Sequence, residues 1–219
     1  MRYKLVLFDL DGVIYDQQPS SESNITIKQF AFEQHYNEGM PLDNIIEQLC
    51  PLWNPYPGMM ELLEAIPAKG LVTNGPTPIQ RAKIAHMSLD KLITPELIFV
   101  SYQEAERILE NENHPYLSGL DSKLSRFEKV MRIAKEYTSK PQPYMVTRAL
   151  IEYGCSPEEC IMIGDQNVDI TAAKSAGTLA IKVEGVKPLS FQNASPQIYQ
   201  PDFTVHKSEI APALYRLLF

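Results

Sequence analysis

The chain has 219 residues, which is enough for one sizeable hydrophobic core and a small second lobe. Hydrophobic residues make up 44% and charged residues 21% of the chain, values that are ordinary for a globular protein. The net charge of −7 argues against a nucleic-acid polymer or an anionic membrane as the main partner.

The hydrophobic runs and the cysteines exclude further classes of protein. No apolar stretch approaches the roughly 20 residues that a membrane-spanning helix needs, and the first residues carry no signal-peptide pattern. The three cysteines, Cys50, Cys155 and Cys160, form neither a disulfide framework nor a zinc pattern. We expect a cytoplasmic protein with buried or half-buried thiols, and nothing in the sequence indicates its oligomeric state.

Short apolar runs alternate with helical patterns along the chain, which predicts an α/β fold with a mostly parallel sheet and helices on both faces. The predicted strands are Tyr3–Phe8, Gly70–Thr73, Leu97–Ser101, Cys160–Gly164, Leu179–Val183 and Phe203–His206. The predicted helices between and after them are Thr77–His86, Leu124–Tyr137, Tyr144–Tyr153, Asn167–Ala176 and Ser208–Leu218.

Two segments interrupt this alternation. Residues 17–56 hold helical patterns at Ile25–Tyr36 and Leu42–Leu49 and end in a proline-rich corner before a helix near Gly58–Ile66, so they predict a small helical lobe. Residues 102–139 begin with the charged stretch Glu104–Glu112 and finish in an amphipathic helix. Charged helices of this kind usually present a solvated face.

Polar residues gather where the predicted strands end, which is where chemistry collects in an open parallel sheet. Asp9 and Asp11 follow the first strand, Thr73-Asn74-Gly75 the second, and Gly164-Asp165-Gln-Asn-Val-Asp169 the fourth. Lys140-Pro-Gln-Pro143 stands just before the helix at Tyr144. Turns, helix caps and an exposed lysine would each explain one of these segments. They do not explain why all four occur in this order on one sheet pattern.

The pair Asp9 and Asp11 is the most informative of these features. Residues i and i+2 leave a strand toward the same side, so both carboxyl groups can reach one substrate. Like charges that close repel and raise each other's pKa. A pair of this kind therefore indicates a cation or a proton in the site.

Taken together, these segments resemble the haloacid dehalogenase-like hydrolase superfamily, particularly its phosphatase branch. The resemblance covers most of the chain from Tyr3 to about Val183 and includes Ala172–Gly177, which fits the helix after the last motif. It implies a modified Rossmann core with a cap inserted soon after the first motif. Residues 17–56 suit that cap, and residues 1–16 and 57–219 suit the core.

The resemblance also implies roles for single residues. Asp9 would be the nucleophile that attacks phosphorus and forms an aspartyl-phosphate intermediate. Asp11 would protonate the departing oxygen and then take a proton from the hydrolytic water. Thr73, the amides near Asn74 and Gly75, and Lys140 would hold the phosphoryl oxygens.

The same resemblance implies a Mg²⁺ site made of Asp9, Asp165 and the backbone carbonyl of Asp11, with Asp169 supporting it from nearby or through water. Charge counting agrees with a metal there, because four carboxylates would otherwise surround one lysine. Two unit charges 4 Å apart interact by about 4 kcal/mol at an effective dielectric near 20. A dianionic phosphate therefore needs a divalent cation and a protonated Asp11, whose neighbours should raise its pKa.

The main departure from the family pattern is the stretch 102–139, which looks like an insertion before the lysine motif. Lys123 is an alternative to Lys140, but it lacks the proline pattern that follows, so we favour Lys140. The insertion would shape the pocket mouth, form an oligomer contact or be a surface elaboration. Near the cap, Tyr15, Trp53 and Tyr56 either line a pocket mouth or, as is commoner for aromatics beside prolines, pack the hinge.

The function that these expectations favour is a Mg²⁺-dependent phosphatase acting on a small phosphorylated metabolite, such as a nucleotide or sugar phosphate. A phosphomutase of the same superfamily is the alternative, since it would return the phosphoryl group from Asp9 to the substrate. A non-catalytic phosphate-ligand or protein-interaction module is a third reading, against which the intact acid, base and metal positions count. Metal-independent dehalogenation fits the second aspartate poorly.

Overall fold

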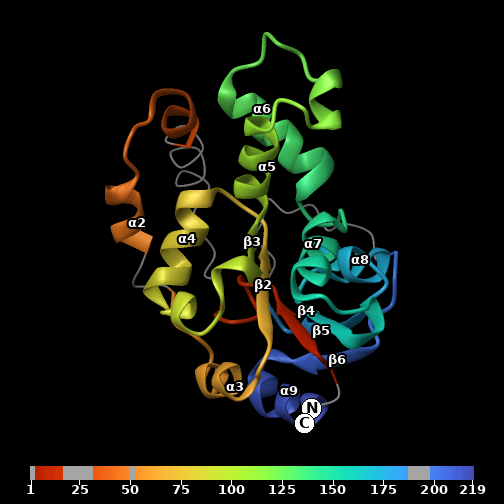
Figure 1. Cartoon of the computed structure of the whole chain (residues 1–219). Helices are drawn as coiled ribbons and strands as arrows, with labels where there is room; N and C mark the ends of the chain where they lie inside the picture. Colours follow the sequence, from red (N-terminus) through yellow and green to blue (C-terminus); the bar gives the residue numbers. More distant parts are fainter. Residues whose placement is uncertain (1–2, 17–31, 50–52, 187–197) are drawn as a thin grey trace.

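A computed structural model of the chain describes residues 3–16, 32–49, 53–186 and 198–219. Its centre is a six-stranded sheet in the order β3-β2-β1-β4-β5-β6, in which every neighbouring pair is parallel (Figure 1). The strands are β1 (Leu5–Phe8), β2 (Lys69–Thr73), β3 (Ile98–Val100), β4 (Cys160–Gly164), β5 (Leu179–Glu184) and β6 (Phe203–His206). The predicted α/β class and parallel sheet are confirmed.

The α-helices of the described residues surround this sheet. They are α2 (Asp43–Leu49), α3 (Met59–Ala65), α4 (Thr77–His86), α5 (Ser101–Glu110), α6 (Arg126–Ile133), α7 (Tyr144–Tyr153), α8 (Asn167–Ser175) and α9 (Ile210–Leu218). Residues 32–38 are helical as well. Helices α4 and α7 have the predicted bounds. The helix predicted at Leu124–Tyr137 is α6 followed by a π-helical turn at Ala134–Thr138, and most of the one predicted at Ile25–Tyr36 lies outside the described residues.

The middle of the sheet is wholly apolar because helices cover both of its faces. All residues of β1 and β4 are buried, which is the continuous hydrophobic pattern expected of central parallel strands. Right-handed crossovers place α3 and α4 on one face and α7 and α8 on the other (Figure 1). The chain order reverses between β1 and β4, and at such a point loops from both strands open a crevice at the carboxyl edge.

The segment 102–139 folds beside α4 as the pair α5 and α6, which stand next to each other above the sheet in Figure 1. The pair has a hydrophobic cluster of its own, built from Ala105, Ile108, Phe127, Val130, Ile133 and Ala134. Tyr36, from the segment predicted as a helical lobe, completes that cluster. The segment 102–139, which the sequence predicted to be an insertion, therefore packs against Tyr36 of the predicted lobe.

The charged face of α5 is only partly solvated. Its outer residues, such as Arg107 and Glu110, are exposed as expected, but the Glu104 side chain is completely buried. Glu104 forms ion pairs with Arg107 at 2.5 Å and with Arg148 of α7 at 3.6 Å. The solvated face expected for this charged stretch is present at its outer residues and fails at Glu104, which α5 turns inward toward α7.

Other expectations concern the cysteines, the aromatics and the membrane. Cys160 is buried and Cys155 half-buried, as predicted, while Cys50 lies outside the described residues. Tyr15 and Trp53 are buried in the main core, which supports the hinge-packing interpretation. Tyr56 is half-buried and donates a hydrogen bond to Asp16. Among the described residues, every helix is too short or too polar to cross a membrane.

Candidate active site

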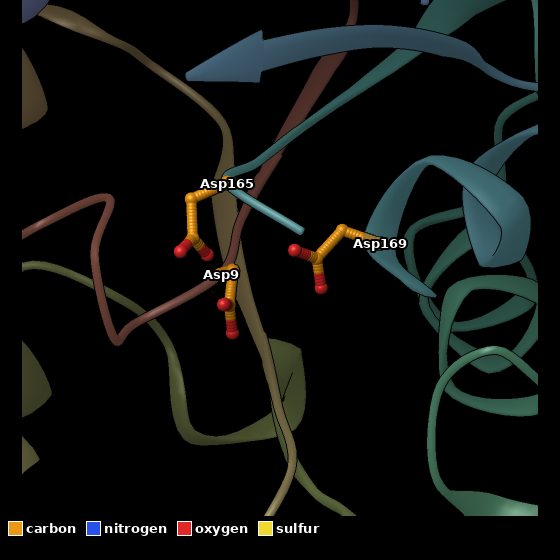
Figure 2. A group of neighbouring side chains, drawn as sticks. All are labelled: Asp9, Asp165 and Asp169. Atoms are coloured by element: carbon orange, nitrogen blue, oxygen red, sulfur yellow. The ribbon is translucent and has the colours of Figure 1, made fainter. Parts of the chain in front are cut away.

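Three aspartates meet where β1, β4 and α8 converge. Asp9 follows β1, Asp165 follows β4 and Asp169 lies in the first turn of α8. One carboxylate oxygen from each lies within 4.8 Å of the others (Figure 2). The β1–β4 pairing explains this meeting, because Phe8 and Ile163 are in register and the Asp9 amide donates to the Ile163 carbonyl at 2.8 Å.

Gly164 allows this convergence. A Cβ atom at position 164 would lie 2.1 Å from the Cβ of Asp169, a distance at which two carbon atoms clash severely. Asp169 also accepts a hydrogen bond from the Gln166 amide at 2.8 Å, which fixes it at the start of α8. The glycine and this helix cap together turn the Asp169 carboxylate toward the site.

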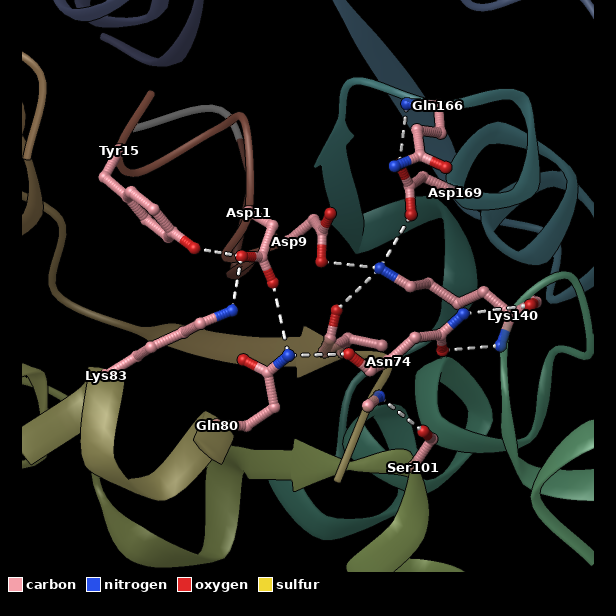
Figure 3. A network of polar contacts seen from close by, with 12 residues as sticks. Asp9, Asp11, Tyr15, Asn74, Gln80, Lys83, Ser101, Lys140, Gln166 and Asp169 are labelled. Carbon is pink, nitrogen blue, oxygen red and sulfur yellow. Dashed lines mark hydrogen bonds and ion pairs between the residues drawn. The ribbon is translucent and has the colours of Figure 1, made fainter. Parts of the chain in front are cut away.

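Lys140 lies at the centre of the site and is almost completely buried (Figure 3). Its Nζ atom is 2.6 Å from an oxygen of Asp9, 2.6 Å from an oxygen of Asp169, and 3.0 Å from the Val72 carbonyl. Lys123 is exposed, outside this group. The structure therefore places the predicted lysine, and not the alternative, beside Asp9.

The carboxylates repel one another strongly in this buried setting. Burial raises the pKa of Asp9 to about 7, with Lys140 opposing the rise and Asp169 and Asp11 adding to it. Burial and the Asp169 and Asp9 carboxylates raise the pKa of Asp165 to about 9. Burial alone would lower the pKa of Lys140, but Asp169 and Asp9 raise it above its usual value. The lysine thus stays charged, and the site holds more negative charge than one lysine neutralises.

The residues predicted to hold phosphate make different contacts from one another. The Asn74 side chain donates to the Lys140 carbonyl at 3.0 Å and accepts from the Lys140 amide at 2.9 Å. The Gly75 amide donates to the Ser101 hydroxyl at 3.0 Å. The Thr73 hydroxyl is buried and makes no hydrogen bond within the described part of the chain. Asn74 therefore positions the lysine, and the Thr73 hydroxyl has hydrogen-bonding capacity to spare.

Asp11 occupies a different environment from the one that the sequence predicted. Burial alone would raise the pKa of its carboxyl group, but Lys83 at 2.5 Å and hydrogen bonds from Tyr15 and Gln80 hold that pKa below its usual range. The expected rise in the pKa of Asp11 is wrong for this structure. A buried cation from α4 outweighs the neighbouring carboxylates.

Gln80 and Lys83 are the residues that the sequence interpretation missed, together with Ser101. Gln80 and Lys83 come from α4, which follows the Thr73–Gly75 motif directly. Their spacing of three residues puts two polar side chains on one helix face, and that was the available signal. Nothing local in the sequence shows that this face turns inward.

The chemistry of the aspartate cluster fits a hard divalent cation. The cluster supplies only carboxylate oxygens, the ligands that Mg²⁺ prefers. One buried oxygen of Asp165 makes no hydrogen bond within the described residues. Burial, together with the neighbouring carboxylates, raises the pKa values of Asp9 and Asp165, and a cation at this point would neutralise part of that carboxylate charge.

Comparison with known proteins assigns the family. The model of the haloacid dehalogenase-like hydrolases matches residues 34–177, more than half of the chain. This chain belongs to the haloacid dehalogenase-like hydrolases. The predicted family and the prediction of an enzyme are confirmed.

Curated relatives of this hydrolase include bacterial proteins named pyrophosphatase PpaX. The one from Bacillus mycoides is 24% identical over 99% of both chains. The one from Bacillus velezensis is 35% identical over a shorter match, which covers 37% of this chain and 36% of the relative.

Solved structures of other family members share the fold. YfnB from Bacillus subtilis, whose structure contains magnesium, has a TM-score of 0.59 and 16% identity, and the match covers 100% of this chain and 99% of YfnB. A phosphatase from Thermococcus onnurineus has a TM-score of 0.56 and 16% identity, with 96% of this chain and 97% of that one covered. At these identities the likeness concerns the fold.

Proposed function

We propose that this hydrolase is a Mg²⁺-dependent phosphatase that cleaves a small phosphorylated metabolite through an aspartyl-phosphate on Asp9. One observation carries the proposal: the Asp9 carboxylate is buried at the end of β1, 2.6 Å from the Lys140 ammonium and beside Asp165. An oxygen nucleophile, a fixed cation and a second carboxylate at one point are what phosphoryl transfer to a carboxylate requires.

In the first step, an Asp9 oxygen forms a bond to phosphorus and the bond from phosphorus to the leaving oxygen breaks. The electron pair of that bond stays on the leaving oxygen, which takes up a proton. Lys140 and the unpartnered Thr73 hydroxyl are the groups of this chain that would stabilise the phosphoryl oxygens.

In the second step, water attacks the same phosphorus and the bond from phosphorus to Asp9 breaks, which releases phosphate. Asp11 takes the proton from the attacking water. Its pairing with Lys83 keeps Asp11 in the carboxylate form that can accept this proton. In the first step Asp11 would take up a proton from solvent as the dianionic phosphate enters and would pass that proton to the leaving oxygen, which returns Asp11 to the carboxylate form that the second step needs.

The residues that would hold Mg²⁺ are Asp9, Asp165 and the backbone carbonyl of Asp11. Asp169 would act from outside the coordination sphere, because its two oxygens are already engaged by Lys140 and by the Gln166 amide. Bound Mg²⁺ would neutralise part of the carboxylate charge and polarise the phosphoryl group. Residues 17–56 would form the cap that gates the entry of water and selects the leaving group.

Two classes of substrate are candidates. The first candidate is a nucleotide or sugar phosphate, whose leaving group the proposed cap would select. Inorganic pyrophosphate is a second candidate, because the relatives that match the full length of the chain are named pyrophosphatases.

The test is hydrolysis of an aryl phosphate, pyrophosphate and a panel of phosphorylated metabolites, with Mg²⁺ and with EDTA. We expect turnover that needs Mg²⁺ and falls by at least about 10³-fold in Asp9→Asn. Asp90→Asn, a substitution of an exposed aspartate after α4, is the matched control and should keep full activity.

The competing functions give different results in the same assay. Isomerised product without net phosphate release would favour a phosphomutase. Absence of turnover with every phosphorylated compound would favour a binding module. Undiminished activity in Asp9→Asn would remove the nucleophile assignment.

A further inference from the structure

Helix α4 sends two side chains to the Asp11 carboxylate, and both are buried (Figure 3). The Lys83 Nζ atom is 2.5 Å from one oxygen of Asp11. The Gln80 Nε2 atom donates to the other oxygen at 3.2 Å. The Tyr15 hydroxyl donates to the oxygen that Lys83 also contacts. Both oxygens of one carboxylate are thus held by groups from two different parts of the chain.

The contacts from α4 differ in kind from the contact with Tyr15. Tyr15 belongs to the same turn as Asp11, closed by a hydrogen bond from the Gly12 amide to the Tyr15 carbonyl at 3.0 Å. Tyr15 therefore moves with Asp11. Helix α4 starts just after β2 and is packed into the core through Ile79 and Ile84, so Gln80 and Lys83 fix the carboxylate relative to the sheet.

Gln80 also connects Asp11 to the phosphate-binding motif. Its Nε2 atom donates a second hydrogen bond to the Asn74 carbonyl at 2.8 Å, while its Oε1 atom makes none within the described residues. The amide faces two acceptors, so an Nε2 atom at that place satisfies both and an oxygen there would repel both. Gly75 leaves the room for this arrangement, because a Cβ at that position would lie 2.7 Å from Nε2.

Lys83 is a buried cation, and among the described residues it forms an ion pair with Asp11 alone. We propose that Gln80 and Lys83 are positioning residues that hold the Asp11 carboxyl group in place for both proton transfers, to the leaving oxygen and from the attacking water. This inference rests on the phosphatase function proposed above. Neither residue touches the phosphoryl group, and both act through Asp11. The competing interpretation is an ion pair that only stabilises the fold.

A double-mutant cycle separates these interpretations. Lys83→Met and Gln80→Leu are each made in the native chain and in Asp11→Asn, and kcat/KM is measured with a series of aryl phosphates of rising leaving-group pKa. We expect Lys83→Met to lower kcat/KM about 10- to 100-fold for the poorest leaving groups and much less for the best ones. In the Asp11→Asn background, the same substitution should cause little further loss.

Two further variants test whether the effect of Lys83→Met depends on the positive charge and on its position. Lys83→Arg keeps a cation that can reach Asp11 and should recover part of the activity toward poor leaving groups. Lys91→Met removes an exposed lysine just after α4 and should match the native enzyme for every substrate. Gln80→Leu, which leaves the ion pair in place, carries the test if Lys83→Met does not fold, as judged by thermal melting followed by circular dichroism.

Each outcome of these measurements supports or overturns the positioning role. An equal loss for good and poor leaving groups, or losses that multiply in the Asp11→Asn background, would overturn the positioning role while leaving the phosphatase in place. Absence of metal-dependent turnover in the native enzyme would overturn the phosphatase proposal and this inference together. A dependence of kcat/KM on leaving-group pKa that is steeper in Lys83→Met than in the native enzyme, and that disappears in the Asp11→Asn background, would support the positioning role.

Discussion

At the scale of single residues, the site is a continuous chain of polar contacts that links four segments of the sequence. Lys83 contacts Asp11, Gln80 contacts both Asp11 and Asn74, and Asn74 holds the backbone of Lys140. Buried polar groups cost free energy unless each one finds a partner, so the network is stable only when its members are all present. A substitution at one residue of this network should therefore displace the residues that it contacts.

Asn74 offers a direct test of this coupling. Asn74→Ala removes both hydrogen bonds to the Lys140 backbone, so we expect kcat/KM to fall about 10- to 100-fold through displacement of the lysine. The free energy of unfolding should fall by about 1–3 kcal/mol, since a backbone amide and a carbonyl lose their partners. Aryl phosphate hydrolysis and urea denaturation measure the two effects. Asn113→Ala, at an exposed position in residues 102–139, is the control. Equal losses of activity and stability in Asn113→Ala and Asn74→Ala would refute the coupling between Asn74 and Lys140.

At the scale of elements, the insertion and the segment before α2 share a hydrophobic cluster. Tyr36 packs near the rings of Tyr102 and Phe127, and its hydroxyl accepts a hydrogen bond from the amide of Thr77 at the start of α4. The Asn37 side chain accepts a hydrogen bond from the Phe127 amide at 3.0 Å. These contacts join residues 32–38 to α4, α5 and α6. The insertion thus supports the segment that we assign to the cap.

Truncation of Tyr36 should loosen this junction without unfolding the sheet. We expect Tyr36→Ala to lower the local stability of residues 32–38 and α6 by about 3 kcal/mol, because a buried ring is lost. Amide hydrogen exchange should show faster exchange there and unchanged exchange in β1 and β4. Tyr153→Ala, at an exposed ring on α7, provides the comparison. Equal protection in Tyr36→Ala and the native chain would contradict this account.

At the scale of the whole molecule, the sheet topology gathers negative charge at one point. Strands β1 and β4 are neighbours at the reversal of the sheet, so their following residues, Asp9 and Asp165, are forced together with Asp169. Folding therefore confines carboxylates that are far apart in the unfolded chain. The cost of that confinement should appear as a dependence of stability on pH.

The direction of this dependence follows from the raised pKa values of about 7 for Asp9 and about 9 for Asp165. Both exceed the value of about 4 for an aspartate in an unfolded chain, so the folded state binds more protons between those values. Without metal, the free energy of unfolding should fall as the pH rises from 5 to 9. The lowered pKa of Asp11 and the raised pKa of Lys140 put their titrations outside this window.

Urea denaturation at pH 5, 7 and 9 in EDTA measures the fall, and Asp165→Asn should flatten it. Mg²⁺ in excess should restore stability at pH 9, by about 2.7 kcal/mol at a concentration 100 times its dissociation constant. Asp90→Asn should leave the profile unchanged. Stability that rises with pH in EDTA, or an identical profile in Asp165→Asn, would contradict the crowded cluster.

The strands, most of the helix bounds and the positions of the four motifs were predictable from local pattern. Apolar runs such as Leu5–Phe8 carry a strand signal within a few residues, and a polar residue directly after a strand of a parallel sheet is placed at its active edge by geometry alone. Lys140 was identifiable because prolines mark its segment. These features depend on neighbours in the sequence.

The environment of each carboxylate depended on the packed fold. Lys83 is 72 residues from Asp11, and only the rotation of α4 about its axis turns its ammonium group to that carboxylate and not to solvent. The same rotation reversed the expected shift in the pKa of Asp11. Side-chain electrostatics depend on distances of a few ångströms between residues remote in the sequence, and those distances exist only once the helices have packed.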